Sequence, residues 1–223
     1  MLRVVISGAT GAVGRALVPA VEAEPDLELA ARAAPTLGTS LADALGTADA
    51  DVAVDFTAPA AAEAAWEAAV AARVPLVTGT TGLRPDDRER LGAKALEAGV
   101  PILFAPNFAI GAVLMMRFAT EASRHMAGAE IIECHHPAKL DAPSGTAART
   151  AALMDGEVPI HSVRLPGIVA DQDVILGGTA QTLTLRHVTT DRTSFMPGVL
   201  LAIRRVVDLP ESPVVGLEHL LFD

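Results

Sequence analysis

A strand, a glycine-rich turn and a helix follow one another at residues 2–24, and this order constrains the fold more than any other feature. Residues 2–7 (LRVVIS) are rich in β-branched side chains, and residues 15–24 have the apolar spacing of a helix. Glycines in such a turn let the backbone approach a pyrophosphate, whose charge the helix N-terminus stabilises. The spacing is Gly-x-x-Gly-x-x-Gly, and it predicts a dinucleotide-binding fold. The residues expected to contact the dinucleotide are Gly8, Ala9, Thr10, Gly11, Ala12, Val13 and Gly14.

Strands and helices alternate up to residue 105. The further predicted strands are residues 27–33, 51–56, 75–78 and 101–105, and the further predicted helices are residues 60–72 and 85–98. Short connections between alternating elements are typical of a doubly wound parallel sheet. We therefore expect an N-terminal α/β domain with a Rossmann-like sheet.

The pattern changes after residue 107. Predicted helices at 109–126 and 146–154 accompany strands at 130–134, 161–165, 173–177 and 181–188, and a last helix covers 198–207. Strands without helices between them favour an open, mixed and mostly antiparallel sheet. We expect residues 1–107 and about 197–223 to form the dinucleotide-binding domain. Residues 108–196 would form a second α+β domain for substrate binding and oligomerisation.

Composition excludes several classes of function. The formal net charge is −10, and phosphate neutralisation requires a surplus of Lys and Arg, so we expect no nucleic-acid partner. Cys134 is the only cysteine, which leaves no internal disulfide and no cysteine-based metal cage. No apolar run reaches the ~18 residues of a membrane span and no signal peptide is recognisable. We expect a cytoplasmic protein without a membrane partner.

Small and polar residues end the third, fourth and fifth predicted strands. In open α/β sheets, ligands bind at the carboxyl ends of the parallel strands, although ordinary turns and caps also occur there. Three such segments at the expected edge favour a second half of the dinucleotide site. The expected contacts are Phe56, Thr57, Gly79, Thr80, Thr81, Ala105, Pro106, Asn107 and Phe108.

Arg32 bears on which dinucleotide is bound. The usual fingerprint places a carboxylate near the tip of the second strand to hold the ribose 2′-hydroxyl. Residues 30–34 contain no carboxylate, and an arginine suits a 2′-phosphate. Arg32 could also be a solvent-exposed strand-end residue. We therefore expect NADPH or NADH, with NADPH favoured.

Residues 133–147 carry the most informative cluster of the chain. His135, His136 and Lys139 lie within five residues, and Lys139 is one of only two lysines. An ammonium group can donate a proton and its pKa can be tuned, whereas a guanidinium cannot do so usefully. Ser144 is a candidate helix cap, and the helix N-terminus behind it would bind a carboxylate. Neighbouring histidines on a strand point to opposite faces, so we expect no metal.

The quoted segments resemble those of the dihydrodipicolinate reductase family over nearly the whole chain. The most specific part is His-His-x-x-Lys-x-Asp-Ala-Pro-Ser-Gly-Thr-Ala at residues 135–147. The resemblance implies reduction of 4-hydroxy-tetrahydrodipicolinate in lysine and diaminopimelate biosynthesis, by hydride transfer from the nicotinamide with loss of water. It implies proton transfer at His135 and proton donation by Lys139. It also implies that the dicarboxylate substrate contacts His136, Gly145 and Thr146.

The same resemblance implies further contacts and an assembly. The segment 191–195 is similar to a family segment near the cofactor, which implies contacts from Arg192 and Phe195. The family is usually a homotetramer formed through the sheet of the second domain, so we expect a homo-oligomer. The sequence departs from the family pattern at Val13, at the missing carboxylate after the second strand, and in the short connection 154–161.

Two other functions stay open on the sequence alone. An acyl-phosphate-reducing dehydrogenase would use Cys134 as its nucleophile beside His135. A cysteine at a strand end, with no helix N-terminus to lower its thiol pKa, is more typical of a structural residue. A dinucleotide-sensing protein without turnover would need no proton donor at Lys139. A short-chain dehydrogenase needs a Tyr-x-x-x-Lys donor and is excluded, because the chain has no tyrosine.

Overall fold

The computed structural model describes residues 1–209 and 212–222, and the chain forms two compact units. The first unit comprises Met1–Phe108 and Phe195–Asp223, and the second comprises Ala109–Ser194. Residues 210, 211 and 223, which belong to the segment expected in the dinucleotide-binding domain, lie outside the described residues. The functions that the sequence assigns to the two domains stay predictions. Within the described part of the chain, no helix is long and apolar enough to cross a membrane.

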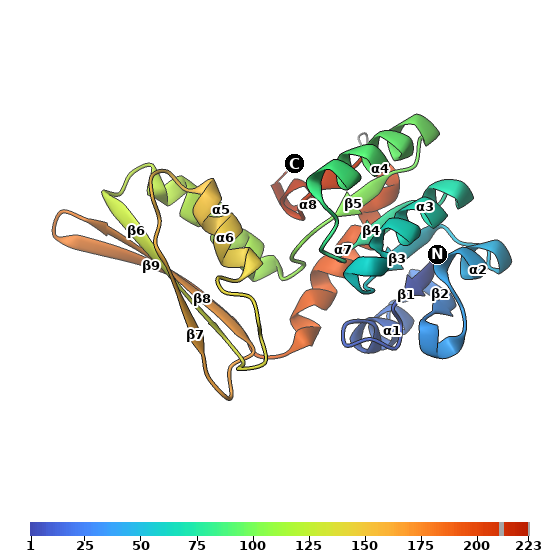
Figure 1. Ribbon diagram of the computed structural model, residues 1–223, viewed down its shortest axis with the longest axis horizontal. Coiled ribbons are helices and arrows are strands. Elements are labelled where there is room, and N and C mark those ends of the chain that lie inside the picture. Colours follow the sequence, from blue (N-terminus) through green and yellow to red (C-terminus); the bar gives the residue numbers. More distant parts are fainter. Residues whose placement is uncertain (210–211, 223) are drawn as a thin grey trace. The chain divides into compact units, whose positions relative to one another are not determined.

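A six-stranded parallel sheet forms the centre of the first unit (Figure 1). Its strand order is β10-β5-β4-β3-β1-β2. The chain moves outward in one direction from β1 to β2 and then in the other direction from β3, so the order reverses between β1 and β3. Such a switch point opens a crevice at the carboxyl ends of the strands. The strands are β1 (Leu2–Ser7), β2 (Leu27–Ala33), β3 (Val52–Asp55), β4 (Leu76–Thr78), β5 (Ile102–Phe104) and β10 (Val214–Val215).

Helices cover both faces of this sheet. One buried cluster joins Leu41 and Trp66 to Val5 and Leu76, so α2, α3 and α4 pack on one face. Helix α7 contacts α1 and β4. The helices are α1 (Gly14–Glu22), α2 (Leu41–Thr47), α3 (Ala62–Ala72), α4 (Pro85–Ala98), α7 (Met196–Arg205) and α8 (Glu218–Phe222). Single 3₁₀ turns are η1 (Pro35–Leu37), η2 (Pro59–Ala61), η3 (Arg192–Phe195) and η4 (Val206–Asp208).

Burial on both faces explains why the sequences of the central strands are almost continuously apolar. Val4, Val5 and Ile6 of β1 are fully buried, and so are all four residues of β3. Parallel strands covered on both faces lose the alternation that marks a half-exposed strand. The predicted strands therefore match β1 and β2 at both ends, and β3, β4 and β5 within one residue at each end.

Helix α2 was not predicted, and a local sequence pattern explains its formation. The Ser40 hydroxyl accepts a hydrogen bond from the backbone N–H of Asp43, and the Asp43 carboxylate accepts one from the backbone N–H of Ser40. This reciprocal pair is a capping box, which satisfies two amides at the helix start. The spacing Ser-x-x-Asp at residues 40–43 is visible in the sequence and could have predicted the helix.

The second unit is a four-stranded sheet with two helices on one face (Figure 1). Its order is β7-β6-β8-β9, in which β6 and β7 are parallel and the other pairs are antiparallel. Met115 and Ala147 of the helices pack on Ile131, Val174 and Leu176 of the strands. The predicted fold class is therefore confirmed for both sheets. The elements are α5 (Ile110–Ser123), β6 (Gly128–His135), α6 (Gly145–Leu153), β7 (Ile160–Arg164), β8 (Ala170–Gly178) and β9 (Gln181–Thr189).

The register of this sheet decides which side chains share a face. Successive side chains of a strand alternate between faces, so Glu133 and His135 lie on the same covered face as Ile131. In the parallel pair, Glu133 is opposite Ser162 and His135 is opposite Arg164. The register therefore brings a carboxylate, an imidazole and a guanidinium to the end of β6.

Candidate active site

The glycine-rich turn requires glycine for steric reasons at two positions. Gly8 has φ of 80°, and a Cβ there would lie 2.3 Å from the Phe56 carbonyl oxygen. A Cβ on Gly14 would lie 2.1 Å from the Gly8 carbonyl oxygen. Helix α1 begins at Gly14, and no side chain caps its N-terminus at Val13. The turn therefore packs tightly against itself and against the loop after β3.

A cavity of about 930 Å³ opens beside this turn, at the switch point between β1 and β3. This volume suits a cofactor-sized ligand. Seven of the predicted residues line it, namely Gly8, Thr10, Gly11, Ala12, Val13, Phe56 and Thr57. The sequence reasoning missed the opposite wall, which comes from the loop after β2 and from α2 and α3. Its members include Ala34, Gly38, Ser40, Leu41, Ala61 and Ala65.

The remaining predicted cofactor residues are not among those that line this cavity. Ala9 and Gly14 are buried in the turn itself, and Arg32 is exposed on β2 beside Ala33, which does line the cavity. Arg192 belongs to the second unit and Phe195 to the first. The other predicted residues follow the ends of β4 and β5. They are Gly79, Thr80, Thr81, Ala105, Pro106, Asn107 and Phe108.

Two of these residues, Gly79 and Phe108, pack against Phe56, which lines the cavity. The rings of Phe56 and Phe108 meet edge to face with centroids 5.4 Å apart. A Cβ on Gly79 would lie 2.2 Å from the Phe56 ring and 3.1 Å from the Phe108 ring. Gly79 thus lets the two rings close over the end of β4. The structure brings together the three strand ends that the sequence singled out.

Asp55 is a buried carboxylate that the sequence reasoning did not assign. It accepts hydrogen bonds from the hydroxyls of Thr57 at 2.9 Å, Thr78 at 3.2 Å and Thr80 at 2.6 Å. Burial raises the pKa of Asp55, and these hydrogen bonds act in the opposite direction. Thr80 also accepts from the backbone N–H of Thr57. Asp55 therefore ties the loop after β3 to the loop after β4.

In the second unit, the buried carboxylate of Glu133 is the centre of a hydrogen-bond network. The Arg164 guanidinium donates to both of its oxygens, from Nη1 at 2.9 Å and from Nη2 at 2.8 Å. His135 Nδ1 lies 2.6 Å from Oε2, and the backbone N–H of Ser144 donates to Oε1 at 3.2 Å. Glu133 has no exposed surface. One carboxylate thus holds the histidine, the arginine and the start of α6.

The charges around Glu133 set the protonation of its partners. Burial alone would raise the pKa of Glu133, but hydrogen bonds from Arg164, Ser162 and His135 lower it to about 2. Burial lowers the pKa of His135, and the positive charges of Lys139 and Arg164 act in the same direction against the Glu133 carboxylate. At neutral pH the site therefore contains an ionised Glu133 and a neutral His135.

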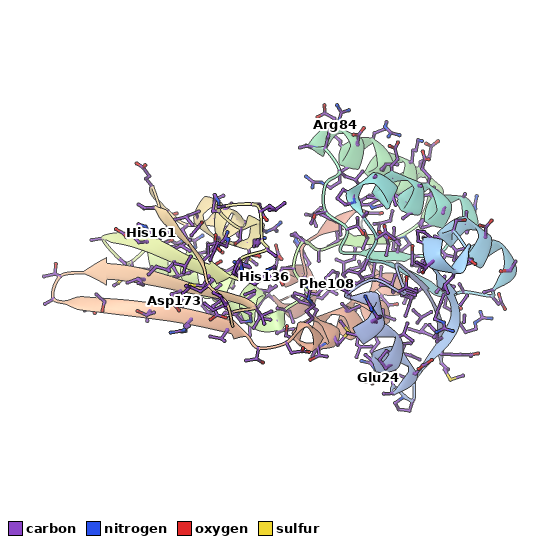
Figure 2. The ribbon with its side chains drawn as sticks, turned by 60° about the horizontal axis from the view of Figure 1, so that its bottom comes forward. Glu24, Arg84, Phe108, His136, His161 and Asp173 are labelled. Atoms are coloured by element: carbon purple, nitrogen blue, oxygen red, sulfur yellow. The ribbon has the colours of Figure 1, made fainter. Side chains whose placement is uncertain are left out.

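Lys139 lies in the loop that follows β6. Its ammonium group forms an ion pair with Asp141 at 2.9 Å, and its side chain is 22% exposed. The Arg164 guanidinium donates to the Asp141 carbonyl oxygen at 2.7 Å, which fixes the same loop to β7. His136 is half-buried just past the end of β6 (Figure 2). The predicted proton-handling residues thus occupy one end of the second sheet.

Helix α6 begins as predicted at the serine. The Ser144 hydroxyl accepts a hydrogen bond from the backbone N–H of Ala147 at 3.2 Å. Gly145 is exposed, and a Cβ on it would meet nothing within 4 Å. The Thr150 hydroxyl donates to the carbonyl oxygen of Thr146 and accepts from buried Gln172 of β8. The first turn of α6 is therefore anchored to the sheet.

Cys134 lacks the features of a catalytic nucleophile. It lies between Glu133 and His135 on β6, so its side chain is on the opposite face of the sheet. Burial raises the pKa of the Cys134 thiol, and the carboxylates of Asp171 and Asp173 raise it further. A reactive cysteine needs the reverse, a lowered pKa.

Comparison with known proteins gives matches along nearly the whole chain. Sequence models of the dihydrodipicolinate reductase N-terminus and C-terminus match residues 2–108 and 111–221. Proteins named 4-hydroxy-tetrahydrodipicolinate reductase from Geobacillus kaustophilus and Mycolicibacterium smegmatis are each 42% identical, with 99% of both chains covered. The first alignment runs over 264 positions against 223 residues here, so that relative contains segments that this chain lacks.

Solved structures give the same result. The chain is similar to a dipicolinate-bound dihydrodipicolinate reductase from Paenisporosarcina sp. TG-14, with a TM-score of 0.86 and 34% identity. That match covers 98% of this chain and 99% of the other. A probable dehydrogenase from Thermotoga maritima has a TM-score of 0.69 at 12% identity, which is a likeness of fold alone.

Proposed function

This chain belongs to the dihydrodipicolinate reductase family, and on that premise we propose which of its residues carry the reaction. The chain is a nicotinamide-dependent oxidoreductase that reduces 4-hydroxy-tetrahydrodipicolinate to tetrahydrodipicolinate in lysine and diaminopimelate biosynthesis. The observation that carries the assignment of residues is the cluster at the end of β6, where His135 and Lys139 lie in a network centred on buried Glu133.

The first unit contains a site that fits a dinucleotide. Gly8 and Gly14 form a cradle that any Cβ would fill, and the cavity beside it has the volume of a cofactor site. We assign the pyrophosphate to the turn Gly8–Gly14 and the start of α1. The apolar wall of Leu41, Ala61 and Ala65 would hold an aromatic base. When bound, the reduced dinucleotide supplies the hydride.

The second unit supplies proton transfer and substrate binding. Lys139, whose ammonium group pairs with Asp141, donates a proton to the substrate as the hydride arrives. Neutral His135 accepts a proton through Nε2 from the ring carbon next to the one that carries the hydroxyl group, and returns it to that hydroxyl group, which leaves as water. His136, exposed Gly145 and half-buried Thr146 at the start of α6 hold the carboxylates of the substrate. The dicarboxylate thus meets two imidazoles, an ammonium and a helix N-terminus.

The choice of dinucleotide is a finer proposal. NADPH remains our favoured cofactor because the tip of β2 offers Arg32 and no carboxylate to the ribose. Arg32 is exposed and does not line the cavity, so its side chain would have to turn toward a 2′-phosphate. If the Arg32 side chain does not turn toward the ribose, we expect the enzyme to use NADH.

Assembly and location are also proposals. The face of the second sheet opposite α5 and α6 carries Ile132, Val163 and Ile175. These residues are only half-buried in a single chain. We propose that this face pairs with other copies in a cytoplasmic homotetramer, and light scattering of the purified protein would measure the mass.

The test of the function is a coupled assay. Substrate is made in the cuvette from pyruvate and aspartate semialdehyde, and oxidation of NADPH and of NADH is followed separately. We expect turnover with both, faster with NADPH, and an Arg32→Ala variant that loses the difference. Dinucleotide binding without turnover would identify a sensing protein instead.

A further inference from the structure

The pair Glu133–Arg164 lies next to the reacting groups without being one of them. Glu133 has no exposed surface, and the side chain of Arg164 is only 20% exposed. Their contact uses two parallel hydrogen bonds of 2.8 and 2.9 Å, and Arg164 also donates to the carbonyl oxygens of Val163 and Asp141. Replacing a buried ion pair by well-packed apolar residues is often neutral for stability, so stability alone does not explain why this pair lies beside the histidine proposed for proton transfer.

The hydrogen bond between Glu133 and His135 determines the tautomer of the ring. An ionised carboxylate can only accept hydrogen bonds, and Glu133 stays ionised because Arg164 donates to both of its oxygens. His135 Nδ1, 2.6 Å from Oε2, must therefore be the donor. In the neutral ring the lone pair is then on Nε2, the nitrogen that faces away from Glu133.

Charge balance around the ring is the second part of the argument. A carboxylate this close to an imidazole normally stabilises the imidazolium form. The charged groups that act on His135 in the described residues are Glu133 from β6, Lys139 from the following loop and Arg164 from β7. Burial is the largest influence and lowers the pKa of His135, Glu133 raises it, and the two cations offset part of the effect of Glu133. The ring therefore keeps a fixed proton on Nδ1 without becoming charged.

We propose that Glu133 and Arg164 are positioning residues for His135: Glu133 fixes the tautomer and the ring orientation, and Arg164 offsets part of the charge of the carboxylate, so that the buried ring stays neutral. Through the Asp141 carbonyl, Arg164 also keeps the Lys139 loop at the same sheet end. This inference rests on the proposed role of His135 in proton transfer.

The test uses charge-changing variants with opposite expected effects. Glu133→Gln removes the carboxylate and leaves two cations, so the pKa of His135 falls by about one unit. Arg164→Gln leaves the carboxylate unbalanced, so the pKa of His135 rises by about one unit. The double variant removes both charges, and the pKa returns toward the wild-type value. Removing both buried partners also costs less stability than removing one, which protects the experiment from unfolding.

Two readouts separate positioning from a purely structural role. Histidine-selective ¹⁵N NMR of the full-length protein gives the pKa and tautomer of His135, assigned with a His135→Asn variant. Steady-state kinetics should show kcat reduced about tenfold to hundredfold in each single variant, with KM changed less. The apparent pKa in the pH profile of kcat should move in the same direction as the pKa of His135 measured by NMR.

Arg186→Gln is the matched control. Arg186 pairs with Asp173 at 3.4 Å on the other face of the same sheet, so its loss should leave the pKa of His135 unchanged. The proposal is overturned if both single variants shift the pKa in one direction, or if folded variants shift it no more than this control. The NMR arm needs no turnover. An inactive wild-type chain would therefore overturn the proposed function alone.

Discussion

The Thr80 hydroxyl donates a 2.6 Å hydrogen bond to the buried carboxylate of Asp55, and this contact joins the ends of two neighbouring parallel strands. Thr57 and Thr78 donate to the same carboxylate. The loops that carry Phe56 and Gly79 are thereby held at a fixed distance beside the cavity. A group with no proposed part in the chemistry thus helps to set the shape of the cavity that we assign to the dinucleotide.

Replacing Asp55 by Ala should lower both stability and dinucleotide affinity. Two buried hydroxyls and one partly buried hydroxyl would lose their acceptor, and we expect a loss of about 3 kcal/mol in the free energy of unfolding. Urea unfolding followed through Trp66, the single tryptophan and fully buried in this unit, gives the value. Exposed Asp86→Asn is the control and should change stability by less than about 0.5 kcal/mol. A similar small change in both variants would contradict the role of Asp55.

Gly14→Ala should damage the dinucleotide site, whereas Gly46→Ala should not. The new Cβ at position 14 would lie 2.1 Å from the Gly8 carbonyl oxygen, so the turn must distort. Gly46 lies in α2 with nothing within 4 Å of a Cβ, and alanine there should stabilise the helix by about 0.5–1 kcal/mol. Titration with NADPH should show weaker binding for the first variant only. Equal affinity of the two variants for NADPH would argue against dinucleotide binding at the glycine-rich turn.

Lys139→Ala should reduce kcat by about 10²–10⁴-fold while the affinity for NADPH stays nearly unchanged. The reason is loss of the proton donor, which lies in the second unit, away from the glycine-rich turn in the sequence. Lys94, the other lysine, forms an exposed ion pair with Glu67, so Lys94→Ala is the natural control and should keep the wild-type rate. A retained rate in Lys139→Ala would refute its role as donor.

Glu133 should make stability depend on acidity in a defined window. Its pKa falls from the usual 4.5 to about 2 in the folded chain, so its ion pair stabilises the fold above pH 4.5. That contribution is lost as the pH falls from 4.5 toward 2. The difference in unfolding free energy between wild type and Glu133→Gln should therefore shrink by up to about 3 kcal/mol across this window. Urea unfolding at several pH values measures it, and a constant difference would contradict the depressed pKa.

Cys134→Ala should retain turnover and dinucleotide binding. The thiol lies on the opposite face of β6 from Glu133 and His135, and burial and nearby carboxylates raise its pKa. The coupled assay with NADPH checks this directly. Full loss of turnover with intact cofactor binding would instead support an acyl-phosphate-reducing enzyme.

The sequence by itself determined the local elements and offered the candidate reacting groups. Apolar spacing and turn residues act over a few positions, so the strand Leu2–Ser7, the glycine-rich turn and the helix after Ser144 could all be predicted. The cluster from His135 to Lys139 is contiguous, and its chemistry could be inferred without a fold. The capping box at Ser40 was equally local but was overlooked.

Only the tertiary structure decided which distant side chains meet. Arg164 lies 31 residues after Glu133, and their contact depends on the register of β6 against β7. A shift of β7 by one residue would turn Arg164 to the other face, and the register depends on burial of one face of the assembled sheet. Asp55 and Thr80 meet for the same reason, through the pairing of β3 and β4. The sequence thus offered the candidate reacting groups, while strand pairing decided which distant side chains contact them.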